Sequence, residues 1–547
     1  MNTGPRETHP VDEQDAGTRL TRKLPSEADT QALGREIALF ARPGDWILLF
    51  GDLGTGKTTL ARAFIRAMLP PEMAEDTEVP SPTFTLVQPY EATRVPVAHV
   101  DLYRIADPFE VDELGLEELA VDHVLLVEWP DRLPVLPPHR LEVHLKDAEG
   151  GRARVAELVG YGDWAARLAR MEAVRRFLEE AAAGAGEIER RFLQGDASAR
   201  RYERVSLPGA KPMILMDMPE RPDGPVVRDG KSYDELAHLA RSVRAVHAID
   251  TELGARGYSA PEIFAHDFER GLLLMEDLGD ITFGRLYAQG AMEEPLKAAT
   301  DVLINLAGRD WPRVVALPEG PPHRLHDYDE AAFVIEAELL VDWFWPHARG
   351  GEPCPETVRR RYVKAVRNML AFAHPPGERE VWVLRDYHSP NLIWLPERDG
   401  LRRVGLIDTQ DAVMGPAAYD LASLLQDARV NIPESLEREM LAHYCAARGR
   451  AEEGFDEAAF RLSYAVMGAQ RALKVLGIFA RLKERDGKPQ YLVHLPRVAF
   501  WLRRNLARRE GLPEAGAAAL TAMLGWLDEY LPELRVLAEE FQAEAEA

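Results

Sequence analysis

A glycine-rich run near the N-terminus constrains the fold of this chain more than any other segment. Residues 51–58 match the phosphate-binding loop pattern, which is glycine, four residues, then Gly-Lys-Ser/Thr. The loop residues are Gly51, Asp52, Leu53, Gly54, Thr55, Gly56, Lys57 and Thr58. The apolar run 46–50 predicts a buried strand before the loop, and residues 59–68 predict a helix after it. This setting favours a nucleoside triphosphate site over the alternative, a glycine-rich turn ahead of an ordinary helix.

The parts of this loop suit the chemistry of phosphate binding. Glycine lets backbone N–H groups turn inward around a phosphate chain, and the start of a helix adds a partial positive charge. We therefore expect Lys57 to reach the β- and γ-phosphates and the Thr58 hydroxyl to ligate Mg²⁺. A helix is predicted to precede the strand, with Ser26 as its N-cap and an end at Leu39.

Composition limits the rest of the chain. Its 547 residues predict two to four domains. Because 90 acidic residues outnumber 66 basic ones, the net charge of −24 argues against nucleic-acid binding through the overall field, and an RNA connection would run through a partner. Residues 1–18 are polar and predicted to be disordered. No apolar run approaches about twenty residues and no signal core is visible, so we expect a cytoplasmic protein without a membrane span.

Two further apolar runs of the N-terminal part end in acids. The run 97–101 ends at Asp101, which we expect to be the second Mg²⁺ ligand of a phosphate-loop ATPase, although such an acid can also be a simple turn residue. The run 124–128 ends at Glu128, a candidate for orienting the attacking water or a metal-bound water. Trp129 is then a candidate for stacking on a base; the alternative is a strand-end acid beside a core indole.

The segment 79–87 lies between these parts and carries two prolines. Proline holds the chain extended, which would leave the hydroxyl of Thr83 near a γ-phosphate. The segment alone favours the alternative, an edge strand with a proline-rich entry. The runs 141–146 and 152–158 flank a turn and predict a hairpin.

Four motifs in order resemble the TsaE family over about residues 19–160. They are Gly-Asp-Leu-Gly-x-Gly-Lys-Thr-Thr (51–59), Ser-Pro-Thr-Phe-Thr-Leu-Val (81–87), His-x-Asp-Leu-Tyr-Arg (99–104) and Glu-Trp-Pro (128–130). The resemblance implies an ATPase that acts with the TsaB–TsaD complex in threonylcarbamoylation of a tRNA adenosine, with TsaD holding the RNA. It also implies that residues 51–59, including Thr59, bind the nucleotide, that Thr83 senses it, that Thr58 and Asp101 hold Mg²⁺, and that Glu128 and Trp129 lie at the nucleotide.

The decisive pattern of the second half lies between residues 381 and 411. An apolar strand leads to Asp386, Asn391 follows five residues later, and the next strand ends at Asp408. Kinase-type phosphoryl transfer needs one Asp to receive or orient the substrate hydroxyl proton, and an Asn and a second Asp to hold Mg²⁺. We therefore expect Asp386 to be the base and Asn391 and Asp408 to be metal ligands; the alternative is two polar strand ends. Asp420 is expected to anchor this loop by hydrogen bonds.

Three weaker signals concern nucleotide binding in the second half. A Gly/Ser turn containing Ser198 runs into a strand and suggests a lid over phosphates, although most such turns are hairpins. The apolar strand 272–275 breaks at Glu276, where a kinase has the hinge that pairs with adenine; an ordinary strand end is the alternative. The strand Met213–Met216 contains no lysine to pair with phosphate, for which Arg201 or Lys211 are substitutes.

These segments resemble the aminoglycoside phosphotransferase-like kinases over about residues 165–510. Within that group, residues 195–202, 384–391, 407–412 and 470–477 resemble AmgK, a family of sugar kinases that phosphorylate the anomeric hydroxyl of N-acetylmuramate and N-acetylglucosamine in cell-wall recycling. Two departures stand out, because Leu384 replaces the usual histidine before the catalytic Asp and the strand lysine is missing.

The sequence thus predicts an α/β P-loop NTPase domain (19–160) followed by an α+β two-lobed, protein-kinase-like aminoglycoside phosphotransferase domain (161–547). Its N-lobe spans about 185–280 and its C-lobe about 281–535. The predicted protein is an ATPase and a small-molecule kinase that uses ATP and Mg²⁺, binds an amino sugar and does not enter a membrane. Two alternatives remain open, namely that the C-terminal half is a non-catalytic nucleotide-binding scaffold, or that the N-terminal half is a nucleoside kinase.

Overall fold

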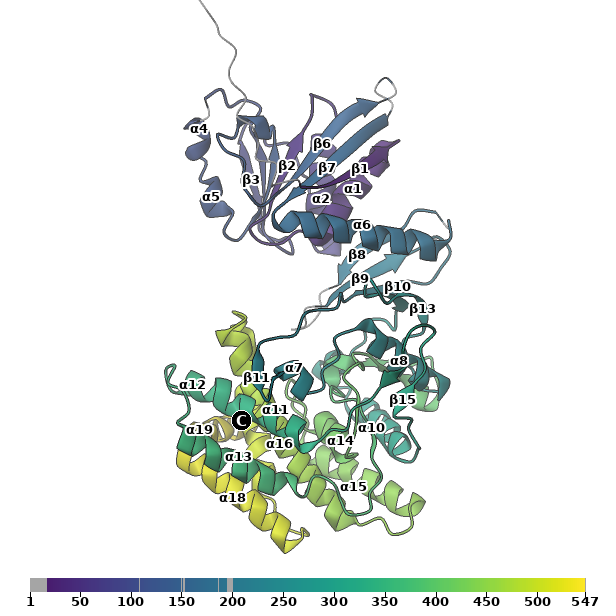
Figure 1. Cartoon of the computed structure of the whole chain (residues 1–547), viewed down its shortest axis with the longest axis vertical. Coiled ribbons are helices and arrows are strands. Elements are labelled where there is room, and N and C mark those ends of the chain that lie inside the picture. The colour runs from purple at the N-terminus through teal and green to yellow at the C-terminus, as the bar shows by residue number, and fades with distance from the viewer. Residues whose placement is uncertain are drawn as a thin grey trace, which may run out of the picture. The chain divides into compact units, whose positions relative to one another are not determined.

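The computed structural model describes residues 17–107, 109–148, 150, 153–184, 186–193 and 200–546. The chain divides into two compact units (Figure 1). Unit 1 comprises Met1–Gln194 and Tyr202–Met213, and unit 2 comprises Gly195–Arg201 and Ile214–Ala547. Of the segment 1–18, which was predicted to be disordered, residues 1–16 lie outside the described residues. The first strand begins at Thr18.

A seven-stranded mixed sheet forms the centre of unit 1, in the order β1-β7-β6-β2-β5-β4-β3. Its strands are β1 (Thr18–Leu24), β2 (Trp46–Phe50), β3 (Val87–Tyr90), β4 (Val97–Asp101), β5 (Val124–Glu128), β6 (Arg140–Ala148) and β7 (Ala153–Tyr161). Strand β2 runs parallel to β5 and β6, and β4 runs parallel to β5. The predicted hairpin is present as antiparallel β6 and β7. Strand β3 begins at Val87, the last residue of the segment 79–87, and lies at the edge of the sheet, which agrees with the alternative interpretation of an edge strand with a proline-rich entry.

Helices pack on both faces of this sheet. They are α1 (Glu27–Phe40), α2 (Lys57–Met68), α3 (Pro71–Ala74), α4 (Phe109–Asp112), α5 (Leu116–Leu119) and α6 (Asp163–Ala182), with a 3₁₀ turn η1 (Pro130–Arg132). Ser26 caps α1 as predicted, because its side chain accepts from the backbone N–H of Asp29. On one face, Leu48 of β2 and Val127 of β5 cluster with Val111 of α4 and Leu116 of α5. Since both faces are covered, β2 is apolar throughout and β5 is apolar up to Glu128, which made both strands visible in the sequence.

A hairpin follows α6 in unit 1 and consists of antiparallel β8 (Glu189–Leu193) and β9 (Arg201–Ser206). In unit 2, β13 (Ile263–Asp267) pairs with β14 (Leu272–Glu276), and β10 (Met213–Asp217) lies beside β14. Two short antiparallel pairs carry the predicted catalytic segments. They are β17 (Val381–Val383) with β20 (Val413–Gly415), and β18 (Leu392–Trp394) with β19 (Val404–Leu406).

The remainder of unit 2 is mainly helical. Its elements are β11 (Val226–Arg228), β12 (Lys231–Ser232), α7 (Tyr233–Leu236), α8 (Val243–Ala255), α9 (Phe283–Ala288), α10 (Glu293–Ala307), β15 (Val314–Val315), β16 (His323–Arg324), α11 (Glu330–Leu339), the π-helical turn η3 (Leu340–Phe344), α12 (Trp345–Ala348), α13 (Glu356–Leu370), η4 (Ser389–Asn391), η5 (Gly400–Arg403), α14 (Ala418–Leu425), α15 (Glu434–Ala451), α16 (Glu457–Glu484), η6 (Pro489–His494), α17 (Leu495–Ala507), α18 (Glu514–Tyr530) and α19 (Glu533–Glu546).

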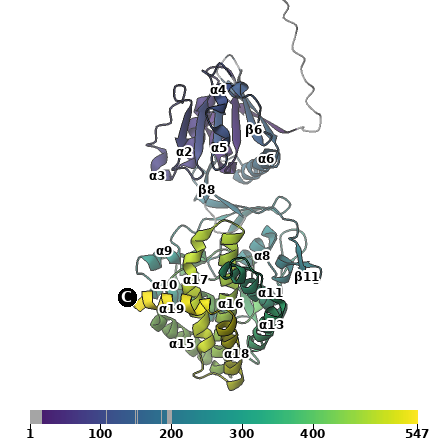
Figure 2. The ribbon, with the colours of Figure 1, turned by 90° about the vertical axis from the view of Figure 1, so that its left-hand side faces the viewer.

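Helix α16 is the central helix of unit 2 and packs against α11, α14 and α17 (Figure 2). It is largely buried along its 28 residues. At Gly477, a Cβ atom would lie 2.3 Å from the backbone carbonyl carbon of Leu339, so only glycine permits this close approach to α11. The helix therefore places polar side chains of the 470–477 motif directly against the catalytic region. None of the helices in the described residues is long and apolar enough to cross a membrane.

Candidate active sites

The first site lies at the carboxyl edge of the parallel strands of unit 1. The loop 51–58 joins the end of β2 to the start of α2. Gly51 has φ of 139°, and a Cβ atom there would lie 2.5 Å from the carbonyl oxygen of Leu145. Gly56 is left-handed, with φ of 103°, and forms the N-cap of α2. The backbone of this loop therefore requires glycine at both positions, as a phosphate cradle does.

Lys57 is folded back over the loop. Its Nζ donates to the carbonyl oxygens of Gly51 and Asp52 at 2.7 and 2.9 Å and lies 3.9 Å from the centre of the Trp129 ring. Burial lowers the pKa of Lys57, while the charges of Glu128 and Asp101 oppose that shift. Carbonyl oxygens are weak partners for an ammonium group compared with phosphate oxygens. The arrangement thus leaves a partly desolvated cation that an entering phosphate can recruit.

Thr58 and Glu128 contact each other directly. The Thr58 hydroxyl lies 3.0 Å from both carboxylate oxygens of Glu128. Nε2 of His99 lies 3.0 Å from Oε1 of the same carboxylate, and both side chains are buried. His99 was not predicted as a site residue. It lies two residues before Asp101 on β4, so the two side chains point to the same face of the sheet.

Asp101 is the neighbour of Glu128 in the register of β4 and β5, so both acids stand at one edge of the sheet. Its carboxylate accepts from the Ser81 hydroxyl at 2.9 Å and from the backbone N–H of Tyr103 at 3.0 Å. The Thr83 hydroxyl lies 3.4 Å from that of Ser81, which connects the segment 79–87 to the acid. The hydroxyl of Thr58 and the carboxylates of Asp101 and Glu128 are oxygen donors of the kind that Mg²⁺ prefers.

The other predicted residues of this site surround the loop. Leu53 is exposed, Gly54 faces open space, and the buried Thr55 hydroxyl donates to the carbonyl oxygen of Asp52. Thr59 is half-buried on the first turn of α2. Trp129 has a left-handed backbone, with φ of 60°, and its ring lies 5.0 Å from that of Tyr103.

The second site is formed by the loops that follow β17 and β19 in unit 2. The Asp420 carboxylate accepts the backbone N–H groups of Leu384 and Arg385 at 2.6 and 2.9 Å, which confirms the predicted anchor. Arg385 is left-handed, with φ of 67°, so the chain turns sharply before Asp386. Asp386, Asn391 and Asp408 then line one small cavity.

Asp386 is held as a carboxylate. Nε2 of His388 lies 3.7 Å from its Oδ1, and the side-chain amide of Asn391 donates to its backbone carbonyl at 3.1 Å. Burial raises the pKa of Asp386, but His388 and the positive charge of Lys474 outweigh it and hold the pKa well below its usual range. His388 therefore braces the loop through a contact with the Asp386 carboxylate itself.

Asp408 follows β19 and has φ of 62°. The guanidinium of Arg200 forms an ion pair with it, and the side-chain amide of Gln410 donates to it at 3.1 Å. Burial and the nearby Asp386 raise the pKa of Asp408, against the effect of Arg200. Two acids and an asparagine around one cavity fit a divalent cation, because such a charge would relieve their repulsion. In the described residues, no group of three or more His, Cys, Asp or Glu side chains is arranged to hold a metal ion, so the asparagine is a necessary part of this set.

The structure describes the contacts of two of the three predicted nucleotide contacts of unit 2, Glu276 and Arg201. The Glu276 carboxylate accepts from Arg398 at 2.6 Å, and its backbone N–H donates to the carbonyl oxygen of Glu262. Arg201 forms an ion pair with Asp217 at 2.7 Å. Ser198 lies outside the described residues. The sequence did not indicate that Arg200 contacts Asp408. Arg200 and Arg201 are adjacent, and nothing in the sequence showed which of the two would reach the site.

A buried network behind the catalytic loop was also missed. Glu336 of α11 accepts from Tyr328 at 2.6 Å, from Gln470 at 3.1 Å, from Lys474 at 2.8 Å and from Arg385. Gln470 and Lys474 belong to the 470–477 motif, and the polar residues of this motif were the feature of the sequence that could have indicated the network. This network connects α11 and α16 to the residue that precedes Asp386.

Comparisons with known proteins find two families that match consecutive parts of the chain. Residues 24–155 match the family described as threonylcarbamoyl adenosine biosynthesis protein TsaE, and residues 189–457 match the phosphotransferase enzyme family. The N-acetylmuramate/N-acetylglucosamine kinase of Caulobacter vibrioides is 37% identical over 361 residues, which cover 64% of this chain and 94% of that protein. The chain belongs to both families.

Two further relatives support the same conclusion. The N-acetylmuramate/N-acetylglucosamine kinase of Pseudomonas aeruginosa is 34% identical over 325 residues, which cover 59% of this chain and 85% of that protein. The tRNA threonylcarbamoyladenosine biosynthesis protein TsaE of Rickettsia conorii is 38% identical over 130 residues, which cover 24% of this chain and 72% of that protein. The predicted fold classes and the two predicted enzyme classes, an ATPase and a phosphotransferase of ATP-using families, are confirmed.

Proposed function

We propose that the chain is a bifunctional enzyme. Its N-terminal part hydrolyses ATP in support of threonylcarbamoyl modification of a tRNA adenosine, together with the TsaB–TsaD complex. Its C-terminal part transfers the γ-phosphoryl group of ATP to the anomeric hydroxyl of N-acetylmuramate or N-acetylglucosamine. The observation that carries the proposal is that two separate sets of acids and amide or hydroxyl groups, each suited to Mg²⁺ and phosphate, stand on the parts that match the two families.

In the N-terminal site, we assign Thr58 and Asp101 to Mg²⁺, which supplies positive charge at the phosphates. Lys57 moves from the loop carbonyls to the β- and γ-phosphates, and the loop N–H groups hold the phosphate oxygens. Glu128, held by His99 at 3.0 Å, orients the attacking water. Because the chain carries a net charge of −24, we assign tRNA binding to the partner complex rather than to this protein.

In the C-terminal site, we assign Asn391 and Asp408 to Mg²⁺. Asp386 accepts the proton of the sugar hydroxyl as that oxygen attacks the γ-phosphorus and the bond to the β-phosphate bridging oxygen breaks. The low pKa of Asp386 keeps it ionised, so it orients the hydroxyl and receives the proton late in the transfer. Arg200 must release Asp408 for the cation to bind, and we assign its guanidinium a contact with the phosphates after that release.

A sugar panel with labelled ATP tests the kinase assignment. We expect a labelled 1-phosphate from N-acetylmuramate or N-acetylglucosamine with the wild type and at least a thousandfold less with Asp386→Asn. Asp301→Asn is the matched control, because this half-exposed acid lies on α10 and pairs with Lys297. No phosphorylated product with any amino sugar would favour the alternative of a nucleotide-binding scaffold.

An ATPase assay with and without TsaB–TsaD tests the other assignment. We expect the complex to stimulate phosphate release by the wild type and not by Lys57→Ala. Transfer of phosphate to a nucleoside without any effect of TsaB–TsaD would instead support the nucleoside-kinase alternative.

A further inference from the structure

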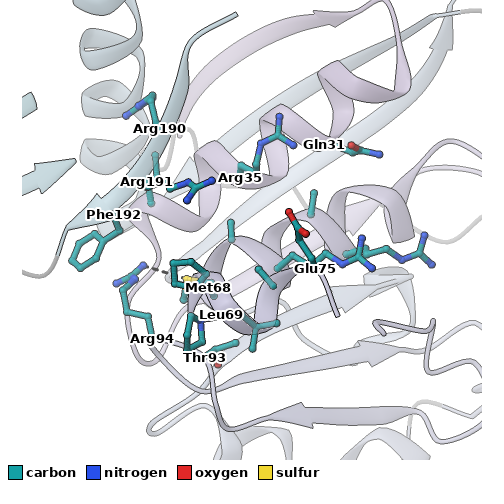
Figure 3. Close-up of a pocket in the computed structure, with 18 of the residues that line it drawn as sticks. Gln31, Arg35, Met68, Leu69, Glu75, Thr93, Arg94, Arg190, Arg191 and Phe192 are labelled. Carbon is teal, nitrogen blue, oxygen red and sulfur yellow. Dashed lines mark hydrogen bonds between the residues drawn. The ribbon is translucent and has the colours of Figure 1, made fainter. Parts of the chain in front are cut away.

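Unit 1 contains a cavity that neither proposed reaction uses. Its volume is about 920 Å³, and it lies among α1, α2, α3, the turn before β4 and strand β8 (Figure 3). Leu39, Met68 and Leu69 provide an apolar floor. Of the residues predicted to bind the nucleotide, Thr59 lines this cavity and Lys57 and Thr58 do not, so the cavity lies beside the phosphate loop.

Arginine dominates the lining of this cavity. Its arginines, which define what we call the arginine cavity, are Arg35, Arg62, Arg66, Arg94, Arg190 and Arg191. They come from α1, α2, the turn before β4 and β8, which are far apart in the sequence, and Figure 3 shows Arg35, Arg94 and Arg191 around the same space. The lining acids are Glu75 and Glu189. A positive cavity of this kind is unexpected in a chain with a net charge of −24.

Ion pairs within the unit neutralise Arg35, which pairs with Glu187, and Arg190, which pairs with Glu36 and Glu203. No ion pair among the described residues neutralises three of the other arginines. Arg62 donates to the carbonyl oxygen of Val79 at 3.0 Å, and Arg66 donates to that of Thr77 at 3.3 Å. Arg191 is exposed and forms no ion pair with any residue that the structure describes. Guanidinium groups that face backbone carbonyls or solvent keep their capacity for a bidentate anion.

Aromatic and apolar groups adjoin this positive charge. The Arg94 guanidinium lies 4.2 Å from the centre of the Phe192 ring, and Arg94 also donates to the carbonyl oxygen of Ala38 at 2.8 Å. An ordered aromatic surface next to several arginines suits a ligand with a phosphate at one end and a sugar or base at the other.

We propose that the arginine cavity binds a small phosphorylated metabolite. Its volume lies in the range of small-molecule sites, which is roughly 300–1,000 Å³. A long polyanion such as RNA would experience the repulsion of the whole acidic chain, whereas a small phosphate ester experiences mainly the local arginines. The shared chemistry is a phosphate ester, and its source is either a sugar phosphate or a nucleotide. The sugar-phosphate source rests on the proposed kinase function, and the nucleotide source does not.

Hydrogen exchange of the full chain locates such binding, because the peptide 186–193 reports on β8 and contains no residue of either proposed active site. The probes are N-acetylglucosamine 1-phosphate, guanosine diphosphate, neutral N-acetylglucosamine and a 20-nucleotide RNA. We expect one of the two phosphate esters to slow exchange in this peptide and neutral sugar to leave it unchanged. The ester that protects the peptide identifies the source.

Matched charge variants then test the role of the arginines. Arg66→Gln/Arg191→Gln removes two exposed cavity charges, and we expect the ligand concentration for half-maximal protection to rise at least tenfold. Arg19→Gln/Arg176→Gln removes the same charge from exposed positions outside the cavity and should change it less than twofold. Sugar phosphorylation measured on the same samples separates failure of this proposal from failure of the kinase assignment.

Three outcomes would overturn the proposal. They are no protection by either phosphate ester at millimolar concentration, equal protection in the cavity variant and the wild type, or protection by RNA alone. The last outcome would assign the cavity to nucleic acid.

Discussion

Glu336→Gln tests whether the buried network behind the catalytic loop stabilises the active conformation. Glu336 is fully buried and balances two cations, Lys474 at 2.8 Å and Arg385. Glutamine keeps the shape but removes the charge, which leaves both cations without their counterion. Breaking a buried ion pair in this way costs about 3–5 kcal/mol. Because Arg385 precedes Asp386, this loss should appear as opening of the catalytic loop.

Native-state hydrogen exchange of the full chain measures this opening locally. We expect exchange in peptides that cover 381–395 to accelerate by at least a hundredfold, which corresponds to about 3 kcal/mol. Peptides from β2 in unit 1 should be unchanged. Glu330→Gln on the same helix is the control, because Glu330 is exposed and its pair with Arg367 contributes at most about 1 kcal/mol. Exchange in Glu336→Gln as slow as in Glu330→Gln would refute the reasoning.

The pH dependence of the same difference provides an internal check. Burial raises the pKa of Glu336, but Lys474 and Arg385 outweigh it, so the pKa in the folded state lies below its ordinary value of 4.5. A depressed pKa contributes stability above the unfolded value, and that stability is lost as the pH falls through the folded value. The difference between wild type and variant should therefore be constant from pH 8 to 5 and shrink below pH 4.5.

Three further predictions follow from single positions. Gly51→Ala places a Cβ atom 2.5 Å from the Leu145 carbonyl and should reduce ATP hydrolysis at least tenfold, whereas Gly44→Ala, also left-handed but 3.5 Å from its nearest neighbour, should leave the rate within threefold. Asp420→Ala leaves two buried N–H groups unpaired and should lower the free energy of unfolding of unit 2 by about 2–6 kcal/mol in urea titrations. Burial raises the pKa of Glu378 to about 7. The contribution of this residue to the free energy of unfolding is therefore fully present below pH 4.5 and is lost as the pH rises through 7. The stability of Glu378→Gln relative to wild type should then increase by about 1–3 kcal/mol between pH 5 and 8, and a flat difference in thermal or urea unfolding would contradict this.

The local elements of the N-terminal site could be predicted from the sequence because each is encoded by neighbouring residues. The apolar run of β2, the glycines of the loop and the start of α2 are contiguous, and the structure places them where the pattern predicted. The common position of Asp101 and Glu128 could be predicted because each ends one of two neighbouring parallel strands. The contact of His99 with Glu128 was not predicted, since it depends on the register between β4 and β5, which no local pattern encodes.

In the C-terminal site, too, contacts between segments that are distant in the sequence could not be predicted. The spacing of Asp386 and Asn391 predicted that both belong to one loop, and Asp420 could be predicted as the residue that anchors this loop by hydrogen bonds. The ion pairs of Glu336 and Arg200 join segments 138 and 208 residues apart, so they depend on the completed fold. Glu276 was predicted from a strand break alone, and its role at the nucleotide stays a prediction; in the structure its backbone N–H donates to the carbonyl oxygen of Glu262.

The most direct test of two independent active sites in one chain is a pair of assays on three proteins. Wild type, Lys57→Ala and Asp386→Asn are each tested for TsaB–TsaD-stimulated ATP hydrolysis and for labelled amino-sugar 1-phosphate. We predict that Lys57→Ala loses only the first activity and Asp386→Asn only the second. Loss of both activities in either variant, or no sugar phosphate from wild type, would contradict the account.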